Sequence, residues 1–539
     1  MIDMKNNLIK YVAAFLVTAF VAGSCAKKLD LFPTNDLTPE KAFSTAAGYK
    51  SVLAKIYGTL AITGNAGPAG NPDISGGLDE GSQVAFIRML FNCNELPTDE
   101  AVVAWNDQTI KDFHNLRWTS ADPFLKGIYA RPIYNITLIN EYIRESTDAK
   151  LAERGISGAD AAEIKKTVAE VRFLRAFNYW VMMDLFGKST FITEDDLIGT
   201  TLPKEISRAN LFLYIEKELK AIDGDLAPAK TIEYGRVDQG AAWALLARIY
   251  LNAGTYTGAT KYTEAVTYSK KVIAAGYALY NGYPKVFMAD NDKAKDEFMF
   301  VVNCDGLRTQ AYGNTTFFAH AACGDEGVQY GVGGGWYGYR STSAFVGLFP
   351  DNTGATDKRA LFTTSKYGTS PAQLIITDIS NFDQGPHVQK WVNVRSDGGP
   401  VSDSKKEFAD IDFPIFRLSE MYLIYAESVL RGGTGGDAAT ALGYVNAIRT
   451  RAYGNASGNI SAGQLTLQFV LDERGRELYW EGHRRTDLVR YGLLTTGTYL
   501  WPWKGGVSSG TSVDAKYNLF PVPASNIVAN PNLTQNTGF

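Results

Sequence analysis

The fold class follows from residues 160–187, which read DAAEIKKTVAEVRFLRAFNYWVMMDLFG. Apolar side chains recur there at the spacing of a helix, and most fall on one face: Val168, Val171, Leu174, Phe177, Trp180, Val181 and Leu185. Such a stripe is typical of an amphipathic helix that buries one side against neighbouring helices. Gly187 follows the last apolar residues and ends the predicted helix, because glycine readily adopts the left-handed conformation that closes a helix.

The same spacing continues on both sides of this segment. It predicts helices over 207–226, 238–253 and 261–275, which form antiparallel pairs with small residues at their crossings. Further helices are predicted at 38–57, 123–143, 416–430, 438–453 and 467–491. The spacing of the pairs resembles that of tetratricopeptide repeats. We therefore expect a mostly α-helical fold with a tetratricopeptide-like superhelix.

Two regions lack this helical periodicity. Residues 62–82 are rich in Gly, Asn, Pro and Asp and predict a loop, and a polar stretch with aromatic residues follows from Arg88 to Trp105. Residues 285–405 are rich in Gly, Tyr, Phe and Asn, with short strand-like pieces such as Phe298–Val302. Long irregular sections inside a helical protein are usually functional. We expect a loop-rich, irregular ligand-binding subdomain there.

Composition excludes several classes of protein. The 539 residues include 53 Lys+Arg and 57 Asp+Glu, for a net charge of −4, and no basic stripe of the kind that binds nucleic acid. The cysteines, at positions 25, 93, 304 and 323, are too scattered for a disulfide framework and lack zinc-site spacing.

The first 25 residues are typical of an export signal. Lys5 and Lys10 precede a mostly apolar run from Tyr11 to Gly23, which is too short to span a bilayer, and small residues lead to Cys25. This layout predicts a bacterial lipoprotein signal in which Cys25 is lipidated and anchors the mature chain. The alternative is an ordinary cleaved signal peptide with Cys25 incidental.

These observations divide the chain into five parts: a lipoprotein signal peptide (1–24), a lipidated tether (25–36), a helical-repeat scaffold with N-terminal binding loops at 62–108 (37–284), a loop-rich ligand-binding insert (285–405), and C-terminal helices with closing loops (406–539).

Sequence motifs at both ends resemble the RagB/SusD family. They are Leu29-Asp30 and Pro33 after Cys25, FRLSEMYLIYAE at 416–427, ERGRELYWEGHRRTDLVRYG at 473–492, FPVP at 520–523 and NPNLTQN at 530–536. FNCNELPTDE at 91–100 and FMADND at 287–292 resemble the starch-binding member of that family. The resemblance implies a cell-surface lipoprotein on the outer membrane, facing the exterior. It also implies that the protein binds starch or malto-oligosaccharides and passes them to a SusC-like TonB-dependent transporter.

The resemblance also implies which residues hold the glycan. An aromatic arc would consist of Trp105, Tyr312 and Trp336, with Arg88, Asp79 and Gln108 as polar partners. Aromatic faces suit the C–H faces of a sugar, and a few polar groups fix its orientation. Three alternatives remain: Trp105 in the core, Trp336 tucked under its own loop, and Arg88 as a structural ion-pair partner.

Two pairs of carboxylates suggest a calcium site. Asp290-Asn291-Asp292 and Asp410-Ile411-Asp412 supply oxygen ligands of the kind that Ca²⁺ prefers. The family resemblance implies Asp292, Asp410 and Asp412 as the ligands. The alternative is that these aspartates cap turns.

No catalytic residues are predicted. Glu473, Glu477 and Glu481 lie at helical spacing and are interleaved with arginines, which favours an ion-pair network over a glycosidase pair. Gly506-Val-Ser508-Ser-Gly510 lacks the strand–turn–helix context of a nucleophile elbow. A glycoside hydrolase, a binding protein for another glycan and a peptide-binding helical scaffold remain the alternatives.

Overall fold

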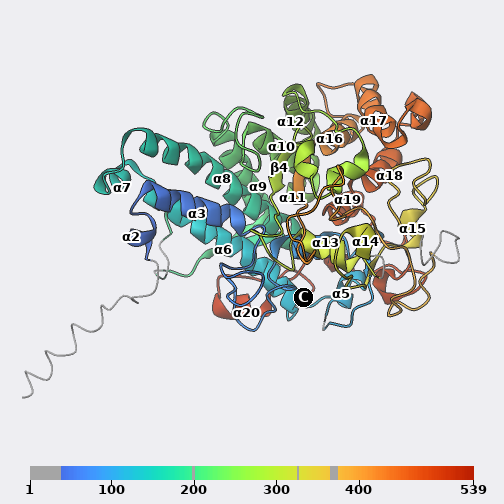
Figure 1. The fold of residues 1–539 in the computed structure, drawn as a ribbon, viewed down its shortest axis with the longest axis horizontal. Coiled ribbons are helices and arrows are strands. Elements are labelled where there is room, and N and C mark those ends of the chain that lie inside the picture. The colour runs from blue at the N-terminus through green and yellow to red at the C-terminus, as the bar shows by residue number, and fades with distance from the viewer. Residues whose placement is uncertain (1–37, 108, 197–198, 200, 325–326, 364–373) are drawn as a thin grey trace, which may run out of the picture. The chain divides into compact units, whose positions relative to one another are not determined.

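The computed structural model describes residues 38–107, 109–196, 199, 201–324, 327–363 and 374–539 (Figure 1). Cys25 and Gln108 lie outside these ranges. Contacts within the chain separate Met1–Val52 from one compact unit, Leu53–Phe539. In the first unit, α2 (Pro39–Ala42) follows the predicted cap Thr38, and α3 (Ala46–Gly58) begins. The predicted helix at 38–57 is therefore interrupted between these two elements.

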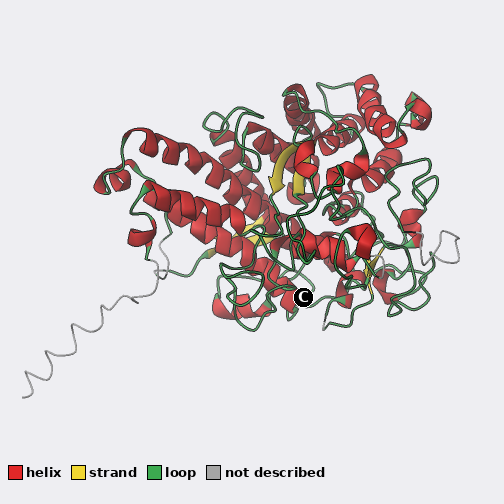
Figure 2. Ribbon diagram, viewed as in Figure 1, coloured by secondary structure: helices red, strands yellow, loops and turns green. Residues whose placement is uncertain are grey.

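Helices dominate the second unit (Figure 2). The α-helices are α4 (Phe86–Asn94), α5 (Lys111–His114), α6 (Pro123–Glu145), α7 (Asp148–Glu153), α8 (Gly158–Phe186), α9 (Arg208–Ala221), α10 (Gln239–Leu251), α11 (Ala253–Thr257), α12 (Tyr262–Ala274), α13 (Thr315–Ala321), α14 (Gly327–Tyr330), α15 (Ser343–Val346), α16 (Leu418–Leu430), α17 (Ala438–Tyr453), α18 (Leu467–Leu478), α19 (Arg484–Arg490) and α20 (Ala524–Ala529). Short 3₁₀ helices are η2 (Tyr283–Phe287), η3 (Asn291–Ala294), η4 (Ala456–Gly458), η5 (Ala462–Gln464), η6 (Lys504–Gly506) and η7 (Ala515–Asn518). The mostly α-helical class is confirmed.

Three short antiparallel strand pairs connect distant parts of the unit. They are β1 (Val102–Val103) with β5 (Tyr339–Arg340), β2 (Lys188–Phe191) with β3 (Lys204–Ser207), and β4 (Phe298–Val302) with β6 (Phe413–Arg417). The predicted strand at Phe298–Val302 is confirmed.

Local signals in the sequence set most helix ends. The α8 helix ends where Gly187, at φ 68°, donates its backbone N–H to Met183, as predicted. Asp122 accepts the N–H groups of Phe124 and Leu125 at the start of α6. The helices then pack on near neighbours in the sequence, with α6 on α8, α8 on α9 and α10 on α12, which agrees with the predicted pairing (Figure 1).

Three further predictions were wrong. The α4 helix lies in the stretch expected to be irregular; all of its residues are buried, including the polar Arg88 and Asn92, which lie one helical turn apart. The segment predicted as helix from 416 starts as strand β6, and α16 begins at Leu418. The long helix at 467–491 is interrupted between α18 and α19, where Trp480 and Gly482 have φ values of 59° and 84°.

The break between α18 and α19 has a tertiary cause. Glu100 accepts the backbone N–H of Trp480 at 3.0 Å, and Glu95 accepts those of Gly482 and His483, at 2.5 and 3.1 Å. These carboxylates satisfy backbone donors that a continuous helix would have paired internally.

The predicted ion-pair network is confirmed, and it is buried. Arg359 contacts Glu473 at 2.8 Å, and Arg417 contacts both Glu477 and Glu481 at 2.6 Å. Burial alone would raise the pKa of Glu473, but the charges of Arg359 and its neighbours outweigh it and lower the pKa to about 2. The ion pairs of these glutamates therefore stabilise the packing of the C-terminal helices.

Candidate functional site

The pairing of β1 with β5 brings together two segments that are far apart in the sequence. Val102 pairs with Arg340 and Val103 with Tyr339, and Ala104 donates its N–H to the carbonyl of Gly338 at 2.8 Å. Trp105 directly follows β1, and the glycine-rich segment that carries Trp336 precedes β5.

These segments border a hollow of about 380 Å³. Its lining residues are Arg88, Trp105, Asn106, Asp107, Trp336 and Phe382. The predicted Arg88, Trp105 and Trp336 thus converge, whereas Asn106, Asp107 and Phe382 were missed. The first two adjoin a predicted residue, but no sequence signal connects Phe382 with the others.

Trp336 is half-buried and rests on a second ring. It stacks on His320 with ring centroids 4.8 Å apart and 21° between the planes, and the backbone N–H of Trp336 donates to the His320 carbonyl. The His320 ring nitrogens lie 2.6 Å from the Gly334 carbonyl and 3.0 Å from the Glu407 carbonyl. One face of the indole is therefore supported by the protein, while the side chain also lines the hollow.

Tyr312 extends the aromatic surface from Trp336. The two ring centroids are 6.2 Å apart, and the Tyr312 hydroxyl donates to Glu407 at 2.7 Å. This hydrogen bond raises the pKa of Tyr312, so the hydroxyl stays protonated. Tyr312 is half-buried and neighbours the hollow through Trp336.

Trp105 is fixed edge-to-face on core aromatics. Its ring centroid lies 5.0 Å from that of Tyr339 and 6.5 Å from that of Phe317. Gly338 makes this possible: its φ is 116°, and a Cβ there would lie 2.3 Å from the indole nitrogen of Trp105. Trp105 is half-buried, so it belongs both to the core edge and to the hollow.

Arg88 is a buried cation on α4. Only 6% of it is exposed, and its guanidinium lies 5.4 Å from the Trp105 ring centroid and 4.7 Å from that of Phe317. Burial lowers its pKa, which Tyr339, Asp79 and Asp107 partly offset. Within the described part of the chain, its Nε has no hydrogen-bond partner. Its Nη1 donates to the Gly81 carbonyl at 3.5 Å, and the guanidinium has further N–H donors for a ligand oxygen.

Asp79 lies near the hollow but is committed to a turn. It is exposed, and its carboxylate accepts from the N–H and hydroxyl of Ser82, at 2.7 and 2.5 Å. Its contribution to Arg88 is electrostatic. The sixth predicted residue, Gln108, lies outside the described residues.

The charges of two candidate calcium ligands act on the third. Burial, together with the charges of Asp292 and Asp410, raises the pKa of Asp412 to about 7. Asp412 accepts from Tyr234 and from the Cys304 N–H, and Asp410 accepts from the N–H groups of Gly306 and Ser402. In the described ranges, no three His, Cys, Asp or Glu side chains are arranged to hold a metal ion.

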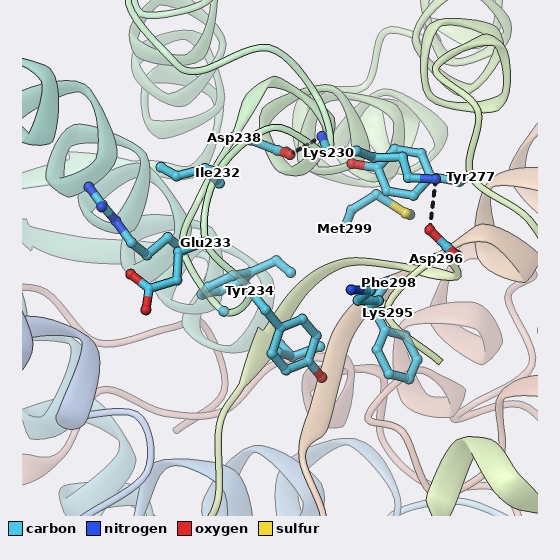
Figure 3. Close-up of a pocket in the computed structure, with 14 residues that line it drawn as sticks. Lys230, Ile232, Glu233, Tyr234, Asp238, Tyr277, Lys295, Asp296, Phe298 and Met299 are labelled. Carbon is cyan, nitrogen blue, oxygen red and sulfur yellow. Dashed lines mark hydrogen bonds and ion pairs between the residues drawn. The ribbon is translucent and has the colours of Figure 1, made fainter. Parts of the chain in front are cut away.

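A second cavity, of about 180 Å³, lies beside β4 (Figure 3). Lys230 and Asp296 form an ion pair of 2.9 Å next to Tyr277, and Asp238 accepts the N–H of Lys230. This cavity is smaller than typical ligand pockets. It contains none of the predicted site residues, so we place the candidate site at the hollow between Trp105 and Trp336.

No helix in the described ranges is both long enough and apolar enough to cross a membrane. The predicted lipidation site, Cys25, lies outside those ranges and stays a prediction.

Comparison with known proteins gives consistent results. A model of the SusD family matches residues 362–539. The starch-binding protein SusD of Bacteroides thetaiotaomicron is 36% identical over 99% of this chain and 100% of its own length. SusD-like protein P25 of Formosa agariphila is 24% identical over 98% of each chain.

Among solved structures, surface glycan-binding protein A of Bacteroides thetaiotaomicron, in complex with laminarihexaose, superposes with a TM-score of 0.68. The match covers 91% of this chain and 99% of that one at 18% identity, so it supports the fold alone. The near full-length likeness to SusD carries the assignment, and the chain belongs to the SusD family.

Proposed function

We propose that this chain is a non-catalytic glycan-binding protein that captures starch and malto-oligosaccharides. The observation that carries the proposal is the convergence of Trp105, Trp336 and the buried Arg88 on one hollow, with Tyr312 beside it. Aromatic faces cover the C–H faces of sugar rings, and the Arg88 guanidinium would donate to hydroxyl oxygens. The choice of an α-glucan is supported by the likeness to a starch-binding relative.

The site supports binding rather than catalysis. A glycosidase needs two carboxyl groups on either side of the scissile bond, whereas Glu473 and Glu477 are fully buried in ion pairs with arginines. Among the residues that line the hollow, Asp107 is the carboxylate. Relatives are likewise named as binding proteins.

We further propose that lipidated Cys25 anchors the protein to the outer membrane, facing the cell exterior. Several acyl chains on one cysteine provide stable anchoring without a spanning helix. Glycan held in the hollow would pass to a SusC-like TonB-dependent transporter. Copurification of a β-barrel protein after mild detergent extraction tests this partner.

Calcium binding at Asp292, Asp410 and Asp412 is also proposed. Its support is the sequence resemblance, and calcium would have to draw these carboxylates together, because the described side chains are not arranged as a metal site. A bound cation would hold Asp412 ionised. Calcium should then raise the melting temperature of the protein, EDTA should reverse the effect, and Asp412→Asn should abolish it.

Calorimetric titration of the chain from Ala26 onward tests the proposed function. The titrants are maltoheptaose, α-cyclodextrin and laminarihexaose. Covering one face of Trp336 buries roughly 100 Å², which at about 25 cal/mol/Å² contributes about 2.5 kcal/mol. Trp336→Ala should therefore weaken binding by roughly 70-fold.

Trp243→Ala is the matched control. Trp243 is a half-buried tryptophan on α10 that donates to Asp223, away from the hollow. Binding of α-glucans that survives Trp336→Ala would locate the site elsewhere. Binding of laminarihexaose alone would favour another glycan, and release of new reducing ends from starch would favour a hydrolase.

A further inference from the structure

Phe382 places an apolar ring in the hollow from an unexpected part of the chain. It lies in the segment 374–386, which has no helix or strand, and 38% of the side chain is exposed. Its ring centroid lies 6.3 Å from that of Tyr337, the residue next to Trp336.

The segment that carries Phe382 is fixed by a buried arginine. Arg340 is fully buried, and its Nη1 donates to the carbonyls of Asn381 and Gln384, at 2.5 and 2.6 Å. Its Nη2 donates to the carbonyl of Ile379 at 2.8 Å. Three backbone carbonyls on both sides of Phe382 are thus held by one rigid, planar guanidinium.

Arg340 also connects this segment with the tryptophans. It lies in β5, where it pairs directly with Val102 of β1, three residues before Trp105. The strand pair that brings Trp105 and Trp336 together therefore also fixes the position of the Phe382 segment.

The segment is preorganised by its own contacts. The Gln384 side-chain oxygen accepts the N–H groups of Thr377 and Asp378, both at 2.8 Å. Gly385 has a φ of 91°, and a Cβ there would lie 2.7 Å from Ile376. A preorganised binding surface loses less conformational entropy when a ligand binds.

We propose that Phe382 is a fourth aromatic contact for the bound glycan and that Arg340 is the positioning residue that holds it. The inference rests on the proposed function and extends the site to a wall that the sequence did not predict. Phe382 has no polar group, so it would contact the C–H face of a sugar ring.

A double-mutant cycle tests this inference by calorimetry with maltoheptaose. Phe382→Ala should weaken binding about tenfold, whereas Phe382→Trp should retain it, with melting temperatures unchanged. Arg340→Lys keeps the positive charge but loses the planar guanidinium that donates to three carbonyls, so it should also weaken binding. Because Arg340 acts through the segment, Arg340→Lys should add nothing when Phe382 is already Ala.

Leu213→Ala is the matched control, since Leu213 is an exposed apolar residue on α9 outside the hollow. Wild-type affinity in Phe382→Ala, together with a loss in Trp336→Ala, would overturn this inference and leave the proposed function intact. An equal effect of Arg340→Lys with Phe or Ala at position 382 would overturn the role of Arg340. A wild-type chain that binds none of the α-glucans would overturn both proposals.

Discussion

Replacing Arg88 by Met should affect binding and stability in different ways. Arg88 is 6% exposed, its Nε has no partner among the described residues, and burial lowers its pKa. The guanidinium lies over two aromatic rings, and its Nη1 makes a long hydrogen bond of 3.5 Å to the Gly81 carbonyl, so the fold offsets the cost of burying this cation only in part. Methionine is of similar length, and its thioether packs well on the rings of Trp105 and Phe317. We expect the free energy of unfolding to be unchanged or slightly higher.

Binding should weaken in the same variant. A hydrogen bond from a charged donor contributes about 1.5–3 kcal/mol, so loss of the guanidinium should weaken maltoheptaose binding by roughly 10- to 150-fold. Calorimetric titration and thermal unfolding of the same preparation measure both quantities.

Arg131→Met provides the contrast. Arg131 is 1% exposed, pairs with Asp73 at 3.0 Å and donates to the Val84 carbonyl at 2.8 Å. Its loss leaves the Val84 and Thr63 carbonyls without this buried donor and removes one of the two cations paired with Asp73, which should cost about 3–5 kcal/mol. With an unfolding entropy of about 2.1 cal/mol/K per residue over roughly 490 residues, this lowers Tm by about 3–5 °C. A similar fall in Tm for Arg88→Met would show that Arg88 is a structural residue and refute the reasoning.

Three further predictions concern the ion-pair network and the hollow. Glu477→Gln should lower the free energy of unfolding by about 3–5 kcal/mol, because it removes one of the carboxylates that pair with the buried Arg417 and Arg451. In denaturant titrations, exposed Asp148→Asn should leave the free energy of unfolding unchanged. The lowered pKa values of Glu473 (about 2) and Glu477 mean that their stabilisation is complete above about pH 4.5 and is lost as the pH falls. Melting temperatures across pH 2–7 check this, and a flat profile would contradict it. Gly338→Ala should displace Trp105, because the added Cβ would collide with its indole, and should therefore weaken glycan binding. The loss should be at least as large as that caused by Trp105→Phe, and calorimetry of the two variants compares them.

Much of the helical architecture could be predicted from the sequence. Apolar residues at helical spacing and Gly187 predicted α8 to within a few residues, although its C-terminal half is buried on every side and not on one face; the bounds of α17 agree with the prediction. These features depend on interactions between residues three or four positions apart, so neighbouring residues determine them. The family motifs, read as a resemblance, also identified three of the residues that meet in the hollow.

Other features required the tertiary structure. The α4 helix is short, with nine residues, and only the tertiary contacts show that its polar face with Arg88 and Asn92 is also buried. The break after α18 depends on Glu95 and Glu100, which lie nearly four hundred residues earlier and capture its backbone N–H groups. Phe382 reaches the hollow because Arg340 holds its segment beside the β1–β5 pair. Contacts between residues so far apart leave no periodic signal in the sequence, and the packed chain alone determines them.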